Sequence, residues 1–306
     1  MVRLQMPMLG VGVLLLSISA GLSRPTPATL SPLAGHRTAQ IPAETNSVRE
    51  LARLVTVRLL LPEDSGSGVI VGREGDRYTL LTNWHVVMTA QGQDISILTA
   101  DGRTHSGRVL PPYQLGNRDL ARVAFSSSQS YRVAEVGEAQ ELSVGDRVYA
   151  AGYPAQVFGL QGDRIISSQD TRDWGLRAFR VTEGAIGLIT DRAFYGGYQL
   201  GYTNDISGGM SGGPVFNAEG QLIGLNGMLS YPFLGIRAFV FEDGSLPSQE
   251  EFVQMEPLNW AVPIQRLPSA TSPLVTPHRP NQAPRAPLPP PEPPAPMTEQ
   301  PLPLVF

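Results

Sequence analysis

The sequence of 306 residues contains no cysteine. Disulfide bonds, thiolate nucleophiles and zinc sites with cysteine ligands are therefore all excluded. Charged residues are scarce at 16%, and a formal net charge of −4 offers no broad basic surface to nucleic acid or anionic lipid. Only four histidines are present, so few side chains can act as a base near neutral pH. We expect no cofactor, no metal site and no nucleic-acid partner.

Long helical periods are also missing, which excludes a doubly wound α/β fold. Only SVRELARL (47–54) and a turn around NWHVV (83–87) have a helical pattern. From about Val55 the chain instead shows short apolar runs bounded by Gly or Asp, and its 32 glycines suit a turn-rich, all-β protein. The predicted strands include VTVRLLL, GSGVIVG, YTLLT, DISILTA, DLARVAF, DRVYAAGYP, DRIISS, GAIGLIT, YQLGY, GGPVF, QLIGLNG and AFVFEDG.

The two ends of the chain differ in composition from its middle. Arg3 precedes an apolar run and then small residues, which predicts a signal peptide over 1–20 and export to the periplasm or the extracellular space. The run is too short to span a membrane, so no membrane association beyond export is expected. Residues 21–45 are interpreted as a linker or propeptide. The Pro-rich residues 268–306 are interpreted as an extended tail that can tether the protein or bind a partner.

A glycine-rich segment carries the strongest chemical signal. In SGGMSGGPVF (207–216), glycines flank Ser211, so no side chain blocks the approach of a carbonyl carbon to its hydroxyl. Gly209 can adopt a positive φ and direct its N–H, together with that of Ser211, at one point, which would form an oxyanion hole. A plain hairpin turn before the strand PVF is the alternative interpretation.

A serine nucleophile needs a base. His85 follows the apolar run YTLLT directly, where a buried strand end would fix its ring, although a core histidine is the alternative. His36 and His278 lie in the two Pro-rich segments, where no rigid scaffold can hold an imidazole. His105 lies in a turn and is expected to face water. We therefore select His85.

The base in turn needs a carboxylate that fixes its tautomer. Asp119 begins the apolar run DLARVAF, where an unpaired carboxylate would be costly and a histidine partner would relieve it. Asp101, in the turn ADGR, is the rival. The order His85, Asp119, Ser211 excludes an α/β-hydrolase, which requires its histidine after the serine.

Residues 55–266 resemble the trypsin-like serine peptidases of bacteria, closest to short cyanobacterial members. The resemblance rests on LLTNWHVV, DLARVAF, GYTNDISGGMSGGPVFNAEGQLIGLNG and the closing NWAVPI. It implies two packed six-stranded antiparallel β-barrels, placed here at 46–140 and 141–267. It also implies catalysis by His85, Asp119 and Ser211 in the groove between them.

Two departures from the family limit that resemblance. Met210 stands where animal digestive members carry an aspartate that receives a new N-terminus, so activation through that ion pair is not expected. The residues after NWAVPIQRL are too few and too rich in proline for a PDZ domain.

The same resemblance suggests where a polypeptide substrate would bind. It places the floor of the S1 pocket at Asp205, where a buried carboxylate would favour Arg or Lys at P1, although an aspartate in an Asn-Asp pair often serves its own turn. It places pairing with an extended substrate on Leu225, Asn226 and Gly227.

We therefore expect a serine endopeptidase that works through an acyl-enzyme. A catalytically silent module that binds extended peptides on the same fold is the first alternative. The second is an exported structural protein whose Pro-rich tail is the functional part.

Overall fold

The computed structural model describes residues 43–137, 142–161 and 164–264. The predicted signal peptide (1–20) and Pro-rich tail (268–306) lie outside the described residues, as does the predicted linker or propeptide except for residues 43–45. Those three residues belong to helix α1 (Ala43–Val55), which contains the predicted helical segment SVRELARL.

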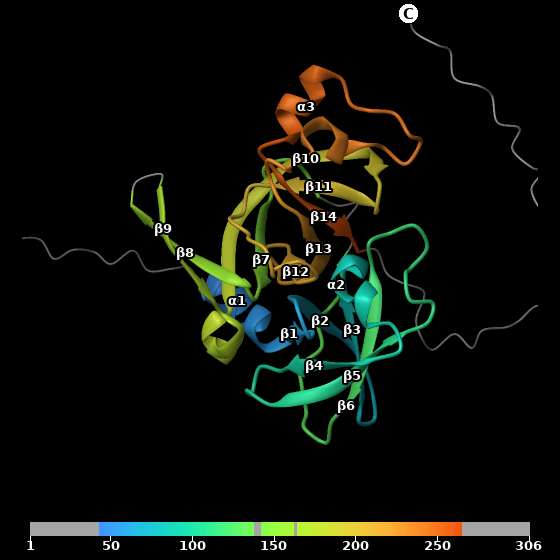
Figure 1. The fold of residues 1–306 in the computed structure, drawn as a ribbon, viewed down its shortest axis with the longest axis vertical. Helices are drawn as coiled ribbons and strands as arrows, with labels where there is room; N and C mark the ends of the chain where they lie inside the picture. Colours follow the sequence, from blue (N-terminus) through green and yellow to red (C-terminus); the bar gives the residue numbers. More distant parts are fainter. Residues whose placement is uncertain (1–42, 138–141, 162–163, 265–306) are drawn as a thin grey trace, which may run out of the picture. The chain divides into compact units, whose positions relative to one another are not determined.

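The first half of the described chain forms a closed antiparallel barrel with strand order β1-β2-β3-β6-β5-β4 (Figure 1). Alternate side chains of these strands, such as Val57, Leu59, Leu80, Val123 and Phe125, are buried in its interior, as the period of two in a strand requires. Its strands are β1 (Thr56–Leu60), β2 (Ser65–Glu74), β3 (Arg77–Thr82), β4 (Asp94–Leu98), β5 (Thr104–Leu110) and β6 (Ala121–Ser126).

The second half forms another closed antiparallel barrel, with order β10-β11-β14-β13-β12-β7. Small and branched side chains, among them Ala150, Ile186, Val215 and Ala261, fill its interior. The prediction of an all-β fold with two six-stranded barrels is therefore confirmed. The strands are β7 (Arg147–Gly152), β10 (Arg180–Phe194), β11 (Tyr198–Tyr202), β12 (Pro214–Phe216), β13 (Leu222–Met228) and β14 (Asn259–Pro263).

A continuous apolar core joins the two barrels. Helix α1 contributes Val48, Ala52 and Val55, whose spacing of four and three residues places them on one face of the helix. The same cluster contains residues of both barrels, including Leu81 and Leu120 from the first and Tyr149, Leu225 and Trp260 from the second. Buried hydrophobic contacts therefore hold the two barrels together.

Several elements differ from the sequence-based expectations. The strand predicted at AFVFEDG is wrong: Phe239 ends a 3₁₀ helix, η4 (Gly235–Phe239), and Phe241 makes only an isolated bridge to Phe194. Both rings pack on Phe194, and Phe239 also packs on Trp260, so burial of the aromatic rings outweighs their preference for strands. Helix α3 (Gln249–Met255) was not predicted, although Ser248 and Glu251 form a capping box at its start.

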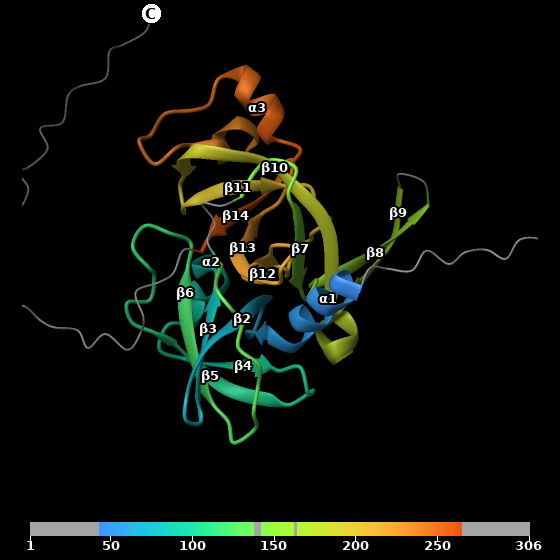
Figure 2. The ribbon, with the colours of Figure 1, turned by 180° about the vertical axis from the view of Figure 1, so that it is seen from behind.

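The remaining elements are a hairpin and short helices. Strands β8 (Gln156–Gln161) and β9 (Arg164–Asp170) form a separate two-stranded sheet, which projects from the second barrel (Figures 1 and 2). The short helices are α2 (Trp84–Val87), η1 (Met88–Ala90) and η3 (Arg172–Ala178).

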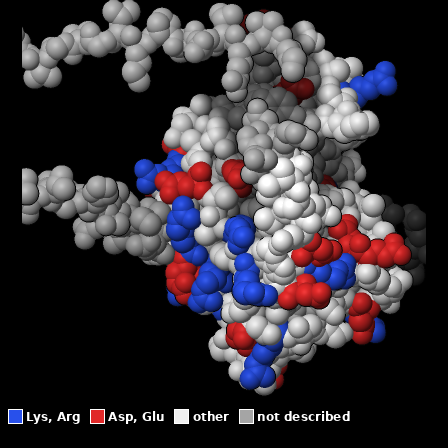
Figure 3. Space-filling model, turned by 60° about the vertical axis from the view of Figure 1, so that its left-hand side comes forward, with Lys and Arg blue, Asp and Glu red and all other residues white. Residues whose placement is uncertain are grey.

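Basic and acidic side chains are interspersed on the face of the molecule shown in Figure 3, rather than separated by sign. Over the described residues, every helix is too short or too polar to cross a bilayer.

Candidate functional site

His85 and Asp119 meet at one edge of the first barrel. His85 lies in the short helix α2, directly after β3, and Asp119 lies directly before β6, the strand that pairs with β3. The backbone N–H of His85 donates to Asp119 Oδ1 at 2.8 Å, and its Nδ1 lies 2.6 Å from Asp119 Oδ2. Asn83, fully buried, donates from Nδ2 to the carbonyl of Asp119 at 2.8 Å and so ties the two segments together.

The two partners differ in exposure. The imidazole of His85 is 41% exposed, whereas the Asp119 side chain is 12% exposed. Burial alone would raise the pKa of Asp119, but the hydrogen bond and charge of His85 and the hydrogen bond from Tyr198 outweigh it, and the pKa lies below its ordinary value. Asp119 is therefore an ionised, fixed acceptor beneath an imidazole that faces outward.

The loop that carries Ser211 contacts the same edge of the first barrel. The N–H of Ser67 in β2 donates to the carbonyl of Ser211 at 2.9 Å. Gly212 has a φ of +80°, and a Cβ there would lie 2.2 Å from Thr82 Oγ1 and 3.0 Å from the nitrogen of Asn83. The serine loop thus packs against the end of β3, three residues before His85. Within the described part of the chain, the Ser211 hydroxyl itself makes no hydrogen bond.

The amides of Gly209 and Ser211 are among those of this loop that donate to no other described residue. Gly209 has a φ of +94°, which an alanine rarely adopts, and its carbonyl accepts a hydrogen bond from Ser67 Oγ at 2.8 Å. Met210 N–H, between the two, is satisfied by the carbonyl of Ser207 at 3.0 Å. Among the described residues, by contrast, the amides of Gly209 and Ser211 donate to no other group. Such a pair of donors can stabilise a developing oxyanion.

A buried arginine is connected to this loop by a series of hydrogen bonds. Arg58 in β1 is fully buried and donates to the carbonyl of Thr171 at 2.7 Å and to its Oγ1 at 2.9 Å. The N–H of Thr171 donates to the carbonyl of Ala155 at 3.0 Å, and the N–H of Ala155 donates to the carbonyl of Gly208 at 2.8 Å. Burial lowers the pKa of Arg58 from its ordinary value. Four segments are thus linked into one support for the Gly208–Gly209 peptide.

Asp101 and His105, the other described acid and histidine considered from the sequence, have partners of their own. Asp101, the rival acid, accepts hydrogen bonds from Thr99 Oγ1 at 2.7 Å and from Tyr131 Oη at 3.0 Å, so its own turn uses its carboxylate. The expectation that His105 faces water is wrong. Its Nε2 lies 2.7 Å from Tyr131 Oη and its ring packs on Phe125, and burial lowers its pKa.

The residues predicted to contact substrate differ in burial. Asp205 is exposed, whereas the pocket argument assumed a buried carboxylate. Leu225 is fully buried, and it pairs with Pro214 in β12 and Val262 in β14. Asn226 is also fully buried, and its Nδ2 donates to the carbonyls of Ala151 at 2.9 Å and Met210 at 3.3 Å.

The Asn226 side chain therefore stabilises the serine loop by its hydrogen bond to the Met210 carbonyl. Its backbone N–H and carbonyl are also engaged, by Gly213 and Gly212 respectively, both at 2.9 Å. Pairing between β12 and β13 stops there, so Gly227 is the first residue of β13 with an open edge on that side among the described residues.

Sequence reasoning missed Tyr198. Its hydroxyl donates to Asp119 Oδ2, the same oxygen that His85 Nδ1 contacts. The run YQLGY signals a strand but contains nothing that indicates a contact with a residue 79 positions earlier.

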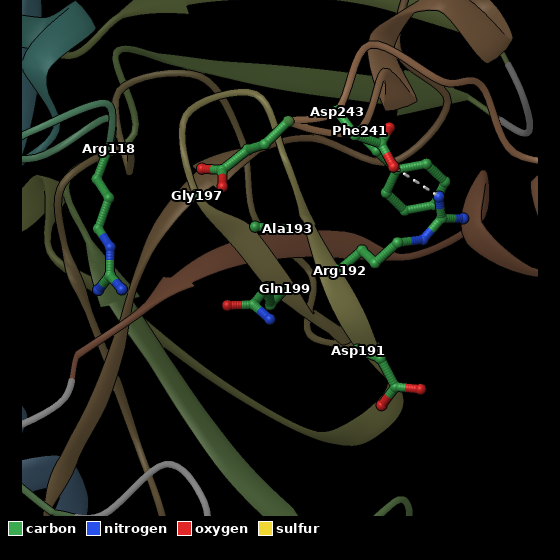
Figure 4. A pocket seen from close by; sticks show the side chains of 9 residues that line it. Arg118, Asp191, Arg192, Ala193, Gly197, Gln199, Phe241 and Asp243 are labelled. Carbon is green, nitrogen blue, oxygen red and sulfur yellow. Dashed lines mark hydrogen bonds and ion pairs between the residues drawn. The ribbon is translucent and has the colours of Figure 1, made fainter.

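A hollow of about 380 Å³ lies near this group but does not include it. It is lined by residues of β10 and β11 and of the chain after η4, together with Arg118 (Figure 4). The guanidinium of Arg192 stacks 3.7 Å from the centre of the Phe241 ring and pairs with Asp243 at 3.2 Å. Two residues that line the hollow are adjacent in sequence to the group around Asp119: Arg118 precedes Asp119, and Gly197 precedes Tyr198.

A known protein family matches the part of the chain that contains His85, Asp119 and Ser211. Residues 66–225, slightly more than half of the chain, match the family model described as a trypsin-like peptidase domain. The chain is 31% identical over 169 residues to the serine protease Do-like HtrB of Bacillus subtilis (strain 168), which covers 53% of this chain and 32% of that protein.

Two further relatives extend the comparison. Identity is 27% over 225 residues with serine protease HTRA4 of Homo sapiens, covering 69% of this chain and 43% of that protein. It is 31% over 171 residues with the probable periplasmic serine endoprotease DegP-like of Rickettsia conorii (strain ATCC VR-613 / Malish 7), covering 55% and 29%. The match thus spans between 29% and 43% of the length of these three relatives.

Proposed function

Because this chain belongs to the trypsin-like peptidase family, we propose that it is a serine endopeptidase that forms an acyl-enzyme on Ser211. The observation that carries the proposal is a juxtaposition. A histidine bonded to a buried carboxylate lies beside a serine loop in which the amides of Gly209 and Ser211 donate to no other described residue. This combination supplies a base, a nucleophile and an anion site at one edge of the first barrel.

Catalysis would begin with attack on the scissile carbonyl carbon by the Ser211 hydroxyl. His85 Nε2 takes the hydroxyl proton as the new C–O bond forms, and Asp119, which holds Nδ1–H, stabilises the resulting imidazolium. The amides of Gly209 and Ser211 stabilise the oxyanion. His85 then gives its proton to the leaving amine as the C–N bond breaks. Water, deprotonated by His85, attacks the ester carbonyl, and His85 returns that proton to Ser211 Oγ as the ester C–O bond breaks.

Among the described residues, no hydrogen bond joins the Ser211 hydroxyl to His85. Catalytic hydrogen bonds are often long or poorly aligned until the substrate is bound, so this arrangement is compatible with general-base catalysis. The His85 side chain is 41% exposed and its Nδ1 contacts Asp119, so Nε2 is the ring nitrogen left for the serine and the leaving group.

The substrate proposed is an extended polypeptide. The edge of β13 that opens at Gly227 would pair with its backbone, which gives affinity independent of sequence. Preference for Arg or Lys at P1 through Asp205 remains a prediction. Since Asp205 is exposed, such a pair would contribute at most about 1 kcal/mol, or roughly a fivefold preference.

We also propose that the protein is exported. The signal-like sequence at residues 1–20 supports this, as does similarity to a relative named as a probable periplasmic endoprotease. The Pro-rich residues 268–306 would then act as a tether or as a binding segment for a partner.

A silent peptide-binding module is the second candidate. It is favoured by one observation, the absence of a hydrogen bond to the Ser211 hydroxyl among the described residues. An active site would react stoichiometrically with a fluorophosphonate probe at neutral pH, and Ser211→Ala would abolish the labelling. A folded wild-type protein that binds extended peptides but is neither labelled nor able to cleave them would establish the silent module instead.

A further inference from the structure

Tyr198 crosses from the second barrel to the first. It is the first residue of β11, and it follows the turn Tyr195–Gly197 that joins β10 to β11. Its side chain is 6% exposed, and its hydroxyl donates to Oδ2 of Asp119, which belongs to the first barrel. A side chain of one barrel therefore reaches the carboxylate of the other.

The surroundings of Tyr198 are shaped around this contact. The N–H of Asp119 donates to the carbonyl of Gly196 at 2.7 Å, so the same turn also holds the backbone of the aspartate. Gly227 in β13 lies on the other side of the ring, and a Cβ at that position would lie 2.4 Å from the Tyr198 hydroxyl. Any larger residue at 227 would displace the hydroxyl from where it now lies.

We propose that Tyr198 is a positioning residue for the peptidase reaction proposed above, because its hydroxyl holds Asp119 at the angle at which Oδ2 accepts Nδ1–H of His85. The proposal rests on that proposed function, whereas the contact between Tyr198 and Asp119 is observed independently of it. Asp119 is held by Tyr198 on one side and by the amide and the ring of His85 on the other. These are the titratable groups that contact the carboxylate among the described residues.

The protonation states fit this role. Burial and the neighbouring Asp119 carboxylate raise the pKa of Tyr198 well above its ordinary value, so the hydroxyl remains a donor at neutral pH. Since Oδ2 accepts from both Tyr198 and His85, the tyrosine withdraws charge from the oxygen that stabilises the imidazolium. Removal of the hydroxyl would make the carboxylate more basic and would favour the imidazolium.

The direction of this effect gives a test that loss of stability cannot imitate. In Tyr198→Phe, we expect kcat to fall about tenfold, KM to stay within about twofold, and the acid limb of the kcat/KM profile to move to higher pH by at least about half a pH unit. The matched control is Tyr78→Phe. Tyr78 is also buried. Its hydroxyl donates to the carbonyl of Gln129 at 2.8 Å and accepts from the N–H of Tyr131 at 3.1 Å, and neither partner contacts Asp119. The control should leave the acid limb unchanged.

A second measurement needs no turnover. In a Ser211→Ala background, the imidazole protons of His85 are followed by NMR from pH 4 to 9, with a His85→Ala sample for assignment. Tyr198→Phe and Gly227→Ala, which displaces the same hydroxyl without removing it, should both raise the titration midpoint.

The outcomes separate the two proposals. If the midpoints of both variants match that of the Ser211→Ala parent, Tyr198 has no positioning role, whether or not the protein is a peptidase. If the wild type neither cleaves peptides nor reacts with fluorophosphonate, the proposed function fails, while a raised midpoint would still support the contact between Tyr198 and Asp119.

Discussion

Two adjacent glycines of the serine loop, Gly208 and Gly209, should differ in whether they tolerate substitution by alanine. Gly209 has a φ of +94°, and a Cβ there would lie 2.3 Å from the nitrogen of Ala155 and 2.7 Å from the carbonyl oxygen of Tyr153. Gly208 has an ordinary φ, and a Cβ there would meet nothing within 4 Å. We therefore expect Gly209→Ala to disable the proposed oxyanion hole and Gly208→Ala to be tolerated.

The magnitude for Gly209→Ala has two parts. Placing an alanine in this backbone region costs about 1–2 kcal/mol, and the two close contacts are with backbone atoms that cannot rotate away. The peptide is therefore expected to turn and to withdraw its N–H. Loss of one oxyanion donor lowers kcat by roughly 10²–10³-fold. The strain alone should lower the melting temperature by about 3–8 °C.

The assay compares the two alanine variants with wild type. A fluorogenic peptide gives kcat and KM, a fluorophosphonate gives the rate of labelling at Ser211, and thermal unfolding reports the strain. Gly209→Ala should lose kcat and labelling with a modest change in KM, whereas Gly208→Ala should stay within about threefold of wild type on each measure. The reasoning is refuted if Gly209→Ala retains kcat, or if Gly208→Ala loses as much as Gly209→Ala does.

Three further outcomes follow from the contacts of the site. Asp119→Asn should lower kcat about 10⁴-fold. Because the pKa of Asp119 is depressed in the folded protein, the stability that its charge contributes is lost as pH falls through that pKa. The variant should therefore flatten the dependence of the unfolding free energy on pH below about pH 4, measured by urea denaturation. Thr171→Val removes a buried hydroxyl that donates to Pro154 and accepts from Arg58, and should lower the unfolding free energy by about 1–3 kcal/mol; an unchanged urea midpoint would contradict the support described for the loop. Asp205→Asn should change the preference for Arg over Leu at P1 by less than about fivefold in a peptide library, and a loss of tenfold or more would show that the carboxylate is desolvated by substrate.

Local patterns predicted the architecture well because barrel strands leave a strong signal. Short apolar runs separated by Gly and Asp indicated an all-β protein, and the resemblance to trypsin-like peptidases implied its two six-stranded barrels. The same reasoning failed at AFVFEDG, where Phe239 and Phe241 are buried against an aromatic cluster without extended pairing. A residue's burial there depends on partners such as Trp260, which a local window does not contain.

Exposure at individual positions was less predictable than chain order. His105 was expected to face water, but Tyr131 and Phe125 cover it. Asp205 was assigned to a buried pocket floor, but it is exposed. In both cases the environment is made by segments distant in sequence, so a turn motif carries no information about it.

The sequence by itself determined the all-β architecture and indicated the candidate residues for acyl-transfer chemistry, because strand periodicity, the glycines around Ser211 and the order of His85 and Asp119 are local or one-dimensional features. Only the tertiary structure decided which groups touch. The reach of Tyr198 to Asp119 and the buried link from Arg58 to the serine loop depend on how two barrels pack across an apolar core. Contacts of this kind join residues tens of positions apart, and their geometry is fixed by the packing of whole strands rather than by the preferences of neighbouring residues.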